Sequence, residues 1–286
     1  VDAGLSAEEV AELEAAYAKA LEPLREVGLD VPPQSLVPAS GSGRFVQYQY
    51  IASNPDGFDD RDRLDDAGDG SNYTRAHAEY HPLLRSLMRN ASLSDLLFVD
   101  VDTGEVVYSV MKRIDVGTNV VSGPWADSAL GSVVDALATV AVGDTVISDT
   151  SFYSPARGEA VFFLATAIRS VSDASGAIVA ELPVKALTNL ATAGQDWDLL
   201  GLGETGNVFL VGADGTLRTD TREWLDDPEQ FLSDHFDRNS DQAAIDQMRL
   251  VGSAALTQAV DNRAVEVALS GETFVGTVTN FEGDKA

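Results

Sequence analysis

The chain has 286 residues, of which 44% are hydrophobic and 23% charged, so it can bury a core and has room for two domains of ordinary size. Its formal net charge of −27 disfavours binding to nucleic acid or to an anionic membrane surface, because both require clustered Lys or Arg. Cysteine is absent, which excludes disulfides and thiolate chemistry, and no run of about 18 apolar residues is present.

A long helix is predicted near residues 5–27. Ser6 and Glu9 have the spacing of a capping box, in which each side chain accepts a hydrogen bond from the other residue's backbone amide. Apolar residues then recur at alternating intervals of three and four, as in a helix packed along a partner or a long body: Val10, Leu13, Tyr17, Ala20, Leu24 and Val27. Gly28 ends the pattern. Two interpretations remain open, a helix that lies on its own domain and one that also pairs in a dimer.

Residues 45–183 are predicted to form a first module with the element order of a PAS-like antiparallel sheet. The stretch 45–90 is expected to be mainly helical around an acidic loop. After it, two runs rich in β-branched and aromatic residues flank a turn that contains Gly104, which favours a β-hairpin. The strands and the helix expected from this point are strands at 95–101 and 106–110, a helix near 128–140, and strands at 144–149, 159–169 and 177–183.

Two groups of polar residues invite comparison with metal sites. His77 and His81 lie four residues apart, but His77 is followed by Ala78 and not by the Glu that a zinc protease requires. The acidic loop at 59–71 offers oxygen ligands, but its carboxylates lack the spacing of an EF-hand. We therefore predict no metal ion and no cofactor. The histidines are interpreted as structural or pocket-edge residues, and the loop as a solvated segment that caps the next helix.

A second module, residues 184–286, is predicted from an internal repeat. The first hairpin pattern returns at 207–220 around the turn Asp214-Gly215, so a fold duplicated in tandem is the economical explanation. Residues 271–278 occupy the place of the third strand, and by this alignment the second module is expected to be truncated at its C-terminal side. The predicted class is therefore α+β, with a long N-terminal helix and connector at 1–44 followed by two tandem PAS-like modules with antiparallel sheets.

The region after the first hairpin carries several distinctive motifs. They are the run Val107 to Lys112, Asp115, Thr118-Asn119 and the run Gly123 to Ser128, together with Tyr80-His81-Pro82 and residues 201–207. In these motifs the chain resembles the double-Cache (dCache) ectodomains of bacterial transmembrane receptors. The resemblance implies that 1–44 is a stalk helix with its connector, that 45–183 is a membrane-distal module, and that 184–286 is a membrane-proximal one.

The same resemblance implies a function. Such ectodomains lie on the periplasmic or extracellular face of the bacterial membrane, between flanking transmembrane helices. They bind a small molecule in the distal module and signal through the stalk, here expected to form a homodimer in the full receptor. Their outputs are adenylate or guanylate cyclases, chemotaxis signalling or sensor kinases, and the sensor region itself is not an enzyme. The alternative is a secreted or periplasmic solute-binding protein that delivers a ligand to a transporter.

Candidate ligand residues lie on the second strand of the first hairpin, on the loop after it, and near the third strand. Tyr108 shares a strand face with Val110, and Lys112 continues that face and would supply a positive charge for a carboxylate. Trp125 would give an apolar wall and Asp127 an acceptor. The predicted ligand is small, and an anionic or zwitterionic one fits these groups. For each candidate, packing or turn capping is the competing interpretation: Tyr108, Lys112, Asn119, Trp125, Asp127, Asp149, Phe152 and Tyr153.

No catalytic motif is apparent. The Gly-x-Ser-x-Gly pattern of hydrolases and a phosphate-binding loop are both missing. Residues 201–206 do spell Gly-x-Gly-x-x-Gly, but the following segment is strand-like, and a dinucleotide site needs a helix whose amino end holds the pyrophosphate. We therefore interpret this segment as a turn and do not predict an enzyme.

Overall fold

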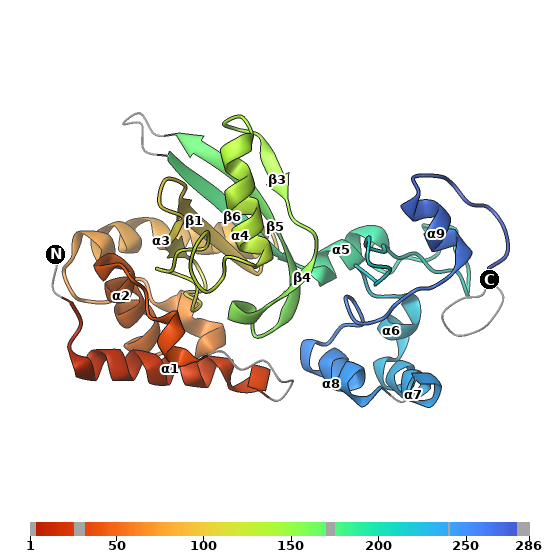
Figure 1. Ribbon diagram of the computed structural model, residues 1–286, viewed down its shortest axis with the longest axis horizontal. Helices are drawn as coiled ribbons and strands as arrows, with labels where there is room; N and C mark the ends of the chain where they lie inside the picture. The colour runs from red at the N-terminus through yellow and green to blue at the C-terminus, as the bar shows by residue number, and fades with distance from the viewer. Residues whose placement is uncertain (1–3, 26–31, 170–174, 240, 279–286) are drawn as a thin grey trace. The chain divides into compact units, whose positions relative to one another are not determined.

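The computed structural model describes residues 4–25, 32–169, 175–239 and 241–278. The chain divides into two compact units, 1–183 and 184–286, each of which is described by itself (Figure 1). Within the described residues, no helix combines the length and the apolar content that crossing a bilayer would require.

The first helix, α1 (Ala7–Arg25), confirms the predicted N-terminal helix. It begins with the expected capping box, in which the Glu9 amide donates to Ser6 Oγ at 3.2 Å and the Ser6 amide donates to Glu9 Oε2 at 2.7 Å. Leu13 and Tyr17 are fully buried in the core of the first unit, which confirms that the helix lies on its own domain. Pairing in a dimer remains a prediction, and the Leu24 side chain, Val27 and Gly28 lie outside the described residues.

The stretch before the sheet is helical, as expected, but it is more finely divided than its sequence indicates. The first part of the acidic segment forms a short 3-10 helix in which Arg61 and Asp62 are buried, while most of residues 63–70 are exposed, as a solvated segment would be. Ser71 caps the long helix that follows by accepting from the Thr74 amide at 3.0 Å, and Pro82 stands inside that helix without ending it. The elements are η1 (Pro33–Leu36), α2 (Gly41–Gln47), η2 (Tyr48–Ala52), η3 (Phe58–Arg63) and α3 (Asn72–Asn90).

Six strands form one antiparallel sheet in the described part of the first unit, in the order β2-β1-β6-β5-β3, with β4 also paired to β5. This confirms the predicted α+β class and the strands of the first module, and it adds β4, which the sequence did not indicate. The pairing of Phe98 with Tyr108 and of Val99 with Val106 leaves Val107 as an extra residue in a bulge. The strands are β1 (Asp95–Asp100), β2 (Glu105–Ser109), β3 (Thr145–Ile147), β4 (Ser151–Tyr153), β5 (Glu159–Arg169) and β6 (Ser175–Pro183).

The two faces of this sheet are covered by different elements. Leu97 and Val99 contribute to the main core with residues of α1, α2 and α4 (Ala129–Ala136), the last of which continues into η4 (Leu137–Thr139). Leu96 and Phe98 point to the other face, where they pack near α3. In Figure 1, α4 lies in front of the sheet and α3 behind it. Successive strand residues point to opposite faces, so one set of side chains fills the main core and the other set faces α3.

The second unit is helical in its described part, and the expectation of a second antiparallel sheet is wrong there. The predicted hairpin turn does form, since the Arg218 amide donates to the Leu210 carbonyl at 2.7 Å, but the pairing is reduced to isolated bridges such as Val211 with Leu217. Residues 271–278, expected as the third strand, make no strand pairing, and a hairpin without further strands has only marginal stability. The helices are α5 (Val184–Ala191), α6 (Arg222–Asp226), α7 (Pro228–Asn239), α8 (Gln242–Val251) and α9 (Arg263–Leu269).

In the described part of this unit, helices contribute most of the buried hydrophobic residues. Its cluster of buried hydrophobic residues combines one hairpin residue with residues of α6, α7 and α8 and of the segment after α8. The members are Leu217, Trp224, Phe231, Leu232, Ile245, Met248, Ala254 and Val260.

Candidate ligand-binding site

A groove of about 520 Å³ lies in the first unit between α3 and the strands β1 and β2. Because β2 is the last strand on its side of the sheet, the groove stays open to solvent there. Tyr80, Leu83 and Val107 are 55%, 69% and 40% exposed at its rim, which is unusual for large apolar side chains. The lining is almost entirely aromatic or aliphatic: Tyr73, Ala76, His77, Tyr80, Leu83, Leu84, Phe98, Val107 and Tyr108.

His77, one of the lining residues, has a buried Nε2 atom without a hydrogen-bond partner among the described residues. The His77 Nδ1 atom lies 2.8 Å from the Asp65 carbonyl oxygen, which can only accept, so Nδ1 carries the proton and Nε2 is left as an acceptor. Burial, and then the positive charge of Lys112, lower the pKa of His77 to about 3. The ring is therefore neutral near pH 7 and offers a buried lone pair.

Behind the groove, His81 connects two of the predicted site residues. Its Nε2 atom donates to the Asp62 carbonyl at 2.6 Å, so its Nδ1 atom accepts from the Tyr108 hydroxyl, also at 2.6 Å. The Lys112 Nζ atom lies 2.9 Å from the same Nε2 atom. Tyr108 and Lys112 thus both contact His81, a residue interpreted from the sequence as structural or at the edge of a pocket.

Lys112 is 2% exposed, and its amine contacts polar atoms inside the protein. Burial lowers its pKa to about 7, against the attraction of Asp95 and Asp62. In its uncharged form the amine can share the Nε2 proton of His81 with the Asp62 carbonyl, while it donates to the Val110 carbonyl at 3.1 Å. The lysine consequently does not present a free positive charge to a carboxylate in solvent.

The backbone at Lys112 is held in an unusual conformation, with a φ of 54° in the left-handed region. The Lys112 amide donates to Ser109 Oγ at 2.8 Å, and its carbonyl accepts from Arg61 Nη1 at 3.4 Å. These hydrogen bonds to the amide and the carbonyl of Lys112 fix the direction of its side chain. The alternation of a regular strand does not predict that direction.

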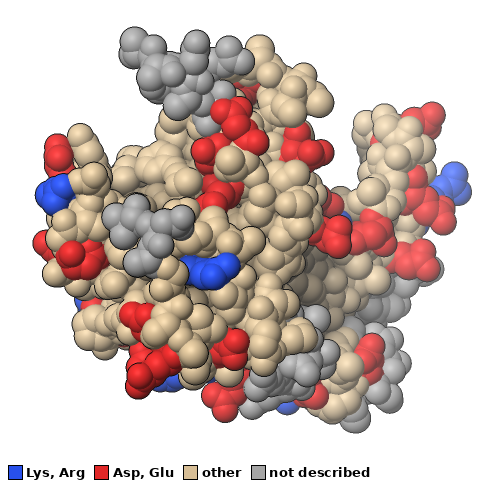
Figure 2. Space-filling view, turned by 60° about the vertical axis from the view of Figure 1, so that its left-hand side comes forward, with Lys and Arg blue, Asp and Glu red and all other residues tan. Residues whose placement is uncertain are grey.

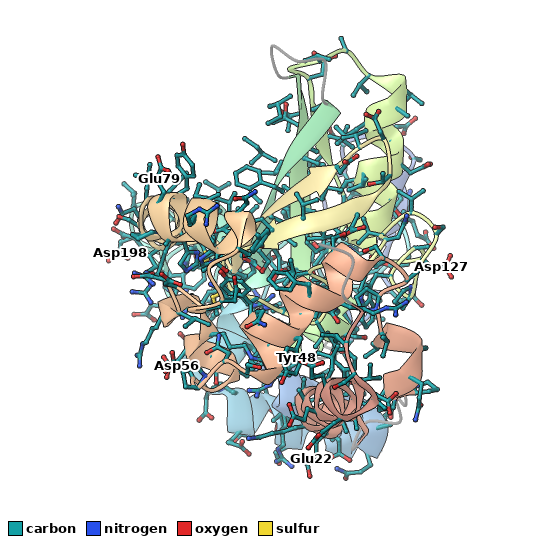
Figure 3. All side chains as sticks on the ribbon, turned by 90° about the vertical axis from the view of Figure 1, so that its left-hand side faces the viewer. Glu22, Tyr48, Asp56, Glu79, Asp127 and Asp198 are labelled. Atoms are coloured by element: carbon teal, nitrogen blue, oxygen red, sulfur yellow. The ribbon has the colours of Figure 1, made fainter. Side chains whose placement is uncertain are left out.

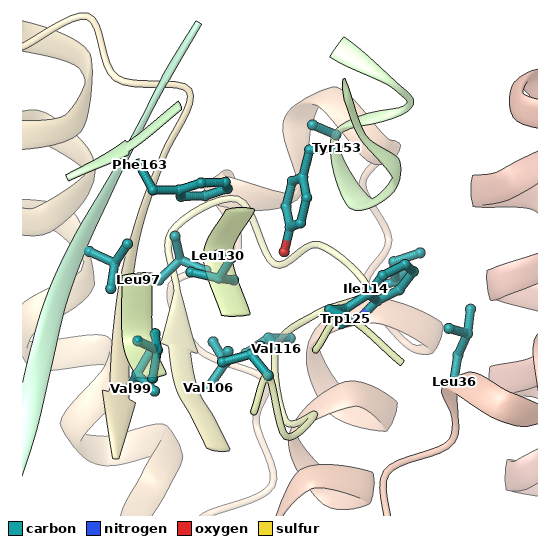
Figure 4. Packing of buried hydrophobic residues seen from close by; sticks show 14 of the residues in the cluster. Leu36, Leu97, Val99, Val106, Ile114, Val116, Trp125, Leu130, Tyr153 and Phe163 are labelled. Carbon is teal, nitrogen blue, oxygen red and sulfur yellow. The ribbon is translucent and has the colours of Figure 1, made fainter. Parts of the chain in front are cut away.

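Four predicted site residues lie away from this groove. Trp125 and Tyr153 are buried in the main core with their rings 6.4 Å apart, and Figure 4 shows the Tyr153 ring between Phe163 and Trp125. Phe152, next along β4, is half-buried. Asp127 is exposed, and Figure 3 shows it on the opposite side of the first unit from Glu79 of α3.

Asn119 and Asp149 make hydrogen bonds within their own loops. The Asn119 Oδ1 atom accepts from the amides of Val121 and Ser122 at 2.9 and 2.8 Å, and thereby caps a turn. The exposed Asp149 accepts from the Thr150 amide through Oδ1 at 2.7 Å. The structure therefore does not assemble the eight candidates into one pocket.

The sheet face toward α4, called the closed face from here on, also carries buried charged residues. Tyr153 donates to Asp115 Oδ2 at 2.6 Å, while burial and then repulsion from Asp95 raise the pKa of Asp115 to about 6. Arg113 forms a buried ion pair with Glu181. Burial opposes the charge of Arg113, but attraction to Glu181 and Asp95 more than offsets it and raises the pKa of the guanidinium above its usual value.

The groove residues on α3 that are not among the eight ligand candidates share a simple signal. Tyr73, His77, Tyr80 and Leu84 follow one another at intervals of four, three and four along α3, which places them on one helix face. Among the described residues, no three His, Asp or Glu side chains are grouped so that they could hold a metal ion.

Comparisons with known proteins give distant structural likenesses. No protein-family model matches the chain, and no curated protein matches it. The ligand-binding domain of the Pseudomonas fluorescens chemoreceptor CtaA in complex with L-serine aligns at a TM-score of 0.33 and 15% identity, over 74% of this chain and 67% of that one.

The same domain in complex with L-valine aligns at 0.33 and 17% identity, over 74% of this chain and 70% of that one. The sensory domain of the Campylobacter jejuni chemoreceptor Tlp3 aligns at 0.34 and 13% identity, over 77% of this chain and 73% of that one. The chain is thus similar, at low identity and low TM-score, to ligand-binding domains of chemoreceptors.

Proposed function

We propose that this chain is the extracytoplasmic ligand-sensing region of a bacterial transmembrane receptor, and that its first unit binds a small molecule in the groove between α3 and β2. The observation that carries the proposal is an apolar groove, open to solvent, that is lined by His77, whose buried Nε2 atom has no partner among the described residues. Binding pockets typically combine such apolar walls with a few fixed polar groups. The sequence resemblance to double-Cache ectodomains supports the receptor context.

The groove favours an uncharged ligand with an apolar ring or chain and one N–H or O–H donor. Its walls, which include Phe98 and Leu84, would cover the apolar part, and the neutral His77 would accept the donor. A charged ligand would have to give up its hydration without gaining a counter-ion, because Lys112 is occupied by His81 and Val110.

In the full receptor, residues 1–44 would serve as the stalk and connector, 45–183 as the membrane-distal module and 184–286 as the membrane-proximal one. Flanking transmembrane helices and a homodimer through α1 complete this proposal. Tyr17 and Leu13 tie α1 to the core of the first unit, so a change of shape there would be passed to the helix.

The test is a thermal-shift screen of uncharged aromatic metabolites, beginning with indole and phenol, followed by calorimetry on the compounds that bind. Binding to the folded state raises the melting temperature. His77→Phe, which keeps a ring but removes the acceptor, should weaken binding by about 1–3 kcal/mol. Ala76→Trp should block the groove, and Leu87→Ala, exposed on α3 and outside the lining, should change nothing. Affinity that survives both His77→Phe and Ala76→Trp would refute the site.

A further inference from the structure

A second cavity in the first unit, of about 730 Å³, shares no residue with the groove. It lies between α1, the end of η2, η3 and the turn that leads into β5. Two guanidinium groups and one aromatic ring face it, together with a lysine and two carboxylates from its rim: Glu12, Lys19, Asp56, Phe58, Arg61 and Arg157.

Arg61 is the buried cation of this cavity. It is 7% exposed, and within the described residues no carboxylate comes within salt-bridge distance of it. Its Nε atom is buried and lacks a hydrogen-bond partner there, and its Nη1 atom makes only a long contact of 3.4 Å with the Lys112 carbonyl. Burial, and then repulsion from Arg157, lower the pKa of Arg61 to about 10 against the attraction of the more distant Asp59, so the group is still charged at neutral pH. A buried cation without a counter-ion is costly.

Arg157 lies near it and is less buried, with 37% of its side chain exposed. Its guanidinium lies 3.8 Å from the Phe58 ring centroid, whereas that of Arg61 lies 5.6 Å from the same ring. Its Nη1 atom is 3.5 Å from Asp59 Oδ2, which is a long pair with a largely exposed carboxylate. The Nε atom of Arg157 is also buried without a partner among the described residues.

The carboxylates of the lining do not neutralise this pair. Glu12 accepts from the Tyr48 hydroxyl at 3.0 Å on the surface of α1, and neither it nor Asp56 forms an ion pair with Arg61 or Arg157. The setting is unusual in a chain with a net charge of −27, where acidic side chains far outnumber basic ones on the face shown in Figure 2. Two guanidinium groups with unmet Nε–H donors are kept close together despite their mutual repulsion.

We propose that this cavity binds a small carboxylate, whose oxygens accept from the Nε–H groups of Arg61 and Arg157 while its carbon skeleton lies against Phe58. Guanidinium groups bind carboxylates through paired, charge-assisted hydrogen bonds, and an incoming anion would remove the repulsion between the two arginines. Such a ligand would be anionic, as the sequence predicts, but its positively charged partner would be Arg61 and not Lys112. The site is independent of the groove beside α3.

The experiment is calorimetry with succinate and benzoate, against sodium chloride at equal ionic strength and against inorganic phosphate. The expected result is saturable binding of at least one carboxylate. Arg157→Ala should weaken it about tenfold or more, and Arg157→Lys less. Arg63→Gln is the matched control, because it removes the same charge from an exposed residue of η3 and should leave the affinity unchanged.

Arg61→Gln should also abolish binding, and if this variant fails to fold, Arg157→Ala carries the test alone. The proposal is overturned if neither carboxylate binds saturably, if phosphate binds and the carboxylates do not, or if Arg63→Gln weakens binding as much as Arg157→Ala. Ala76→Trp must leave carboxylate binding intact. If it does not, the ligand occupies the groove and this assignment is wrong.

Discussion

The two faces of the sheet in the first unit use similar residues for different purposes. On the face toward α4, Tyr153 is enclosed by the main core and donates to Asp115. On the face toward α3, Tyr108 donates to His81 at the edge of a groove that is open to solvent. An aromatic hydroxyl with a polar partner therefore does not mark a ligand site by itself. What distinguishes the α3 side is its opening to solvent at the edge strand. Buried polar atoms without a partner among the described residues occur on both faces, such as His77 Nε2 on one and Trp125 Nε1 on the other.

The largest effect should come from breaking the buried ion pair on the closed face. Arg113→Met leaves Glu181 without its partner, and the free energy of unfolding should fall by about 3–5 kcal/mol. The double variant with Glu181→Met should recover most of this loss, because both charges are then gone. Urea denaturation of the two variants measures the difference. A single variant within about 1 kcal/mol of the native chain would contradict the assigned pairing.

On the open side, Lys112 should make stability depend on pH. Its pKa is lowered from 10.5 to about 7 in the folded state, so between these values the unfolded chain binds more protons and the free energy of unfolding rises with pH. Lys112→Met should remove this rise, which is on the order of a few kcal/mol, and should be more stable than the native chain at and below neutral pH.

Urea denaturation across that range measures the slope, and Lys185→Met, at an exposed lysine of the second unit, is the control. An unchanged slope in Lys112→Met would show that the amine is not the titrating group.

A smaller effect is expected from Tyr153→Phe on the closed face. It removes the hydrogen bond to Asp115 and leaves that carboxyl buried with less support, at a cost of about 1–3 kcal/mol. Because the pKa of Asp115 is raised to about 6, the folded state already holds the extra proton below that value, and the cost should be larger at pH 7 than at lower pH. Tyr80→Phe, at an exposed tyrosine, should cost nothing measurable. Equal losses of unfolding free energy in the two variants would show that the hydrogen bond from Tyr153 to Asp115 does not stabilise the core.

The smallest effect concerns the helix that forms the open side. Ser71→Ala removes the side chain that caps α3 and should lower the free energy of unfolding by about 1 kcal/mol. Thermal denaturation beside Ser86→Ala, an exposed serine in the same helix, isolates the cap from the general effect of the substitution. No difference between the two would mean that the α3 start is held by Asp69 and Thr74 alone, which are joined at 2.8 Å.

Much of the first unit follows from local pattern. The capping box and the spacing of Leu13 and Tyr17 predicted α1, and the β-branched runs around Gly104 predicted the β1–β2 hairpin. These signals suffice because the period of apolar residues sets which face of each element is buried. The same rule failed in the second unit, whose described residues offer the hairpin pattern isolated bridges and no neighbouring strand that would extend its pairing.

The candidate sites were less accessible to sequence reasoning. Lys112 is a candidate from the strand pattern, yet its charge state depends on burial and on His81, which comes from another element. Arg61 was counted as part of a solvated acidic loop, because nothing local reveals that η3 turns it inward. Partners that lie far apart along the chain decide whether a polar group is satisfied or available, and pattern alone does not supply them.

The bulge at Val107 has a consequence for how this sheet meets other chains. Strand β2 stands at an edge, where exposed amides and carbonyls could template a strand from another molecule. Here the Val106 amide and carbonyl are taken by Thr118 and Gly117 at 2.9 and 2.7 Å, and the Tyr73 hydroxyl occupies the Val107 carbonyl at 3.1 Å. The edge is thereby protected against intermolecular sheet extension and aggregation. A partner on this side has to bind through side chains.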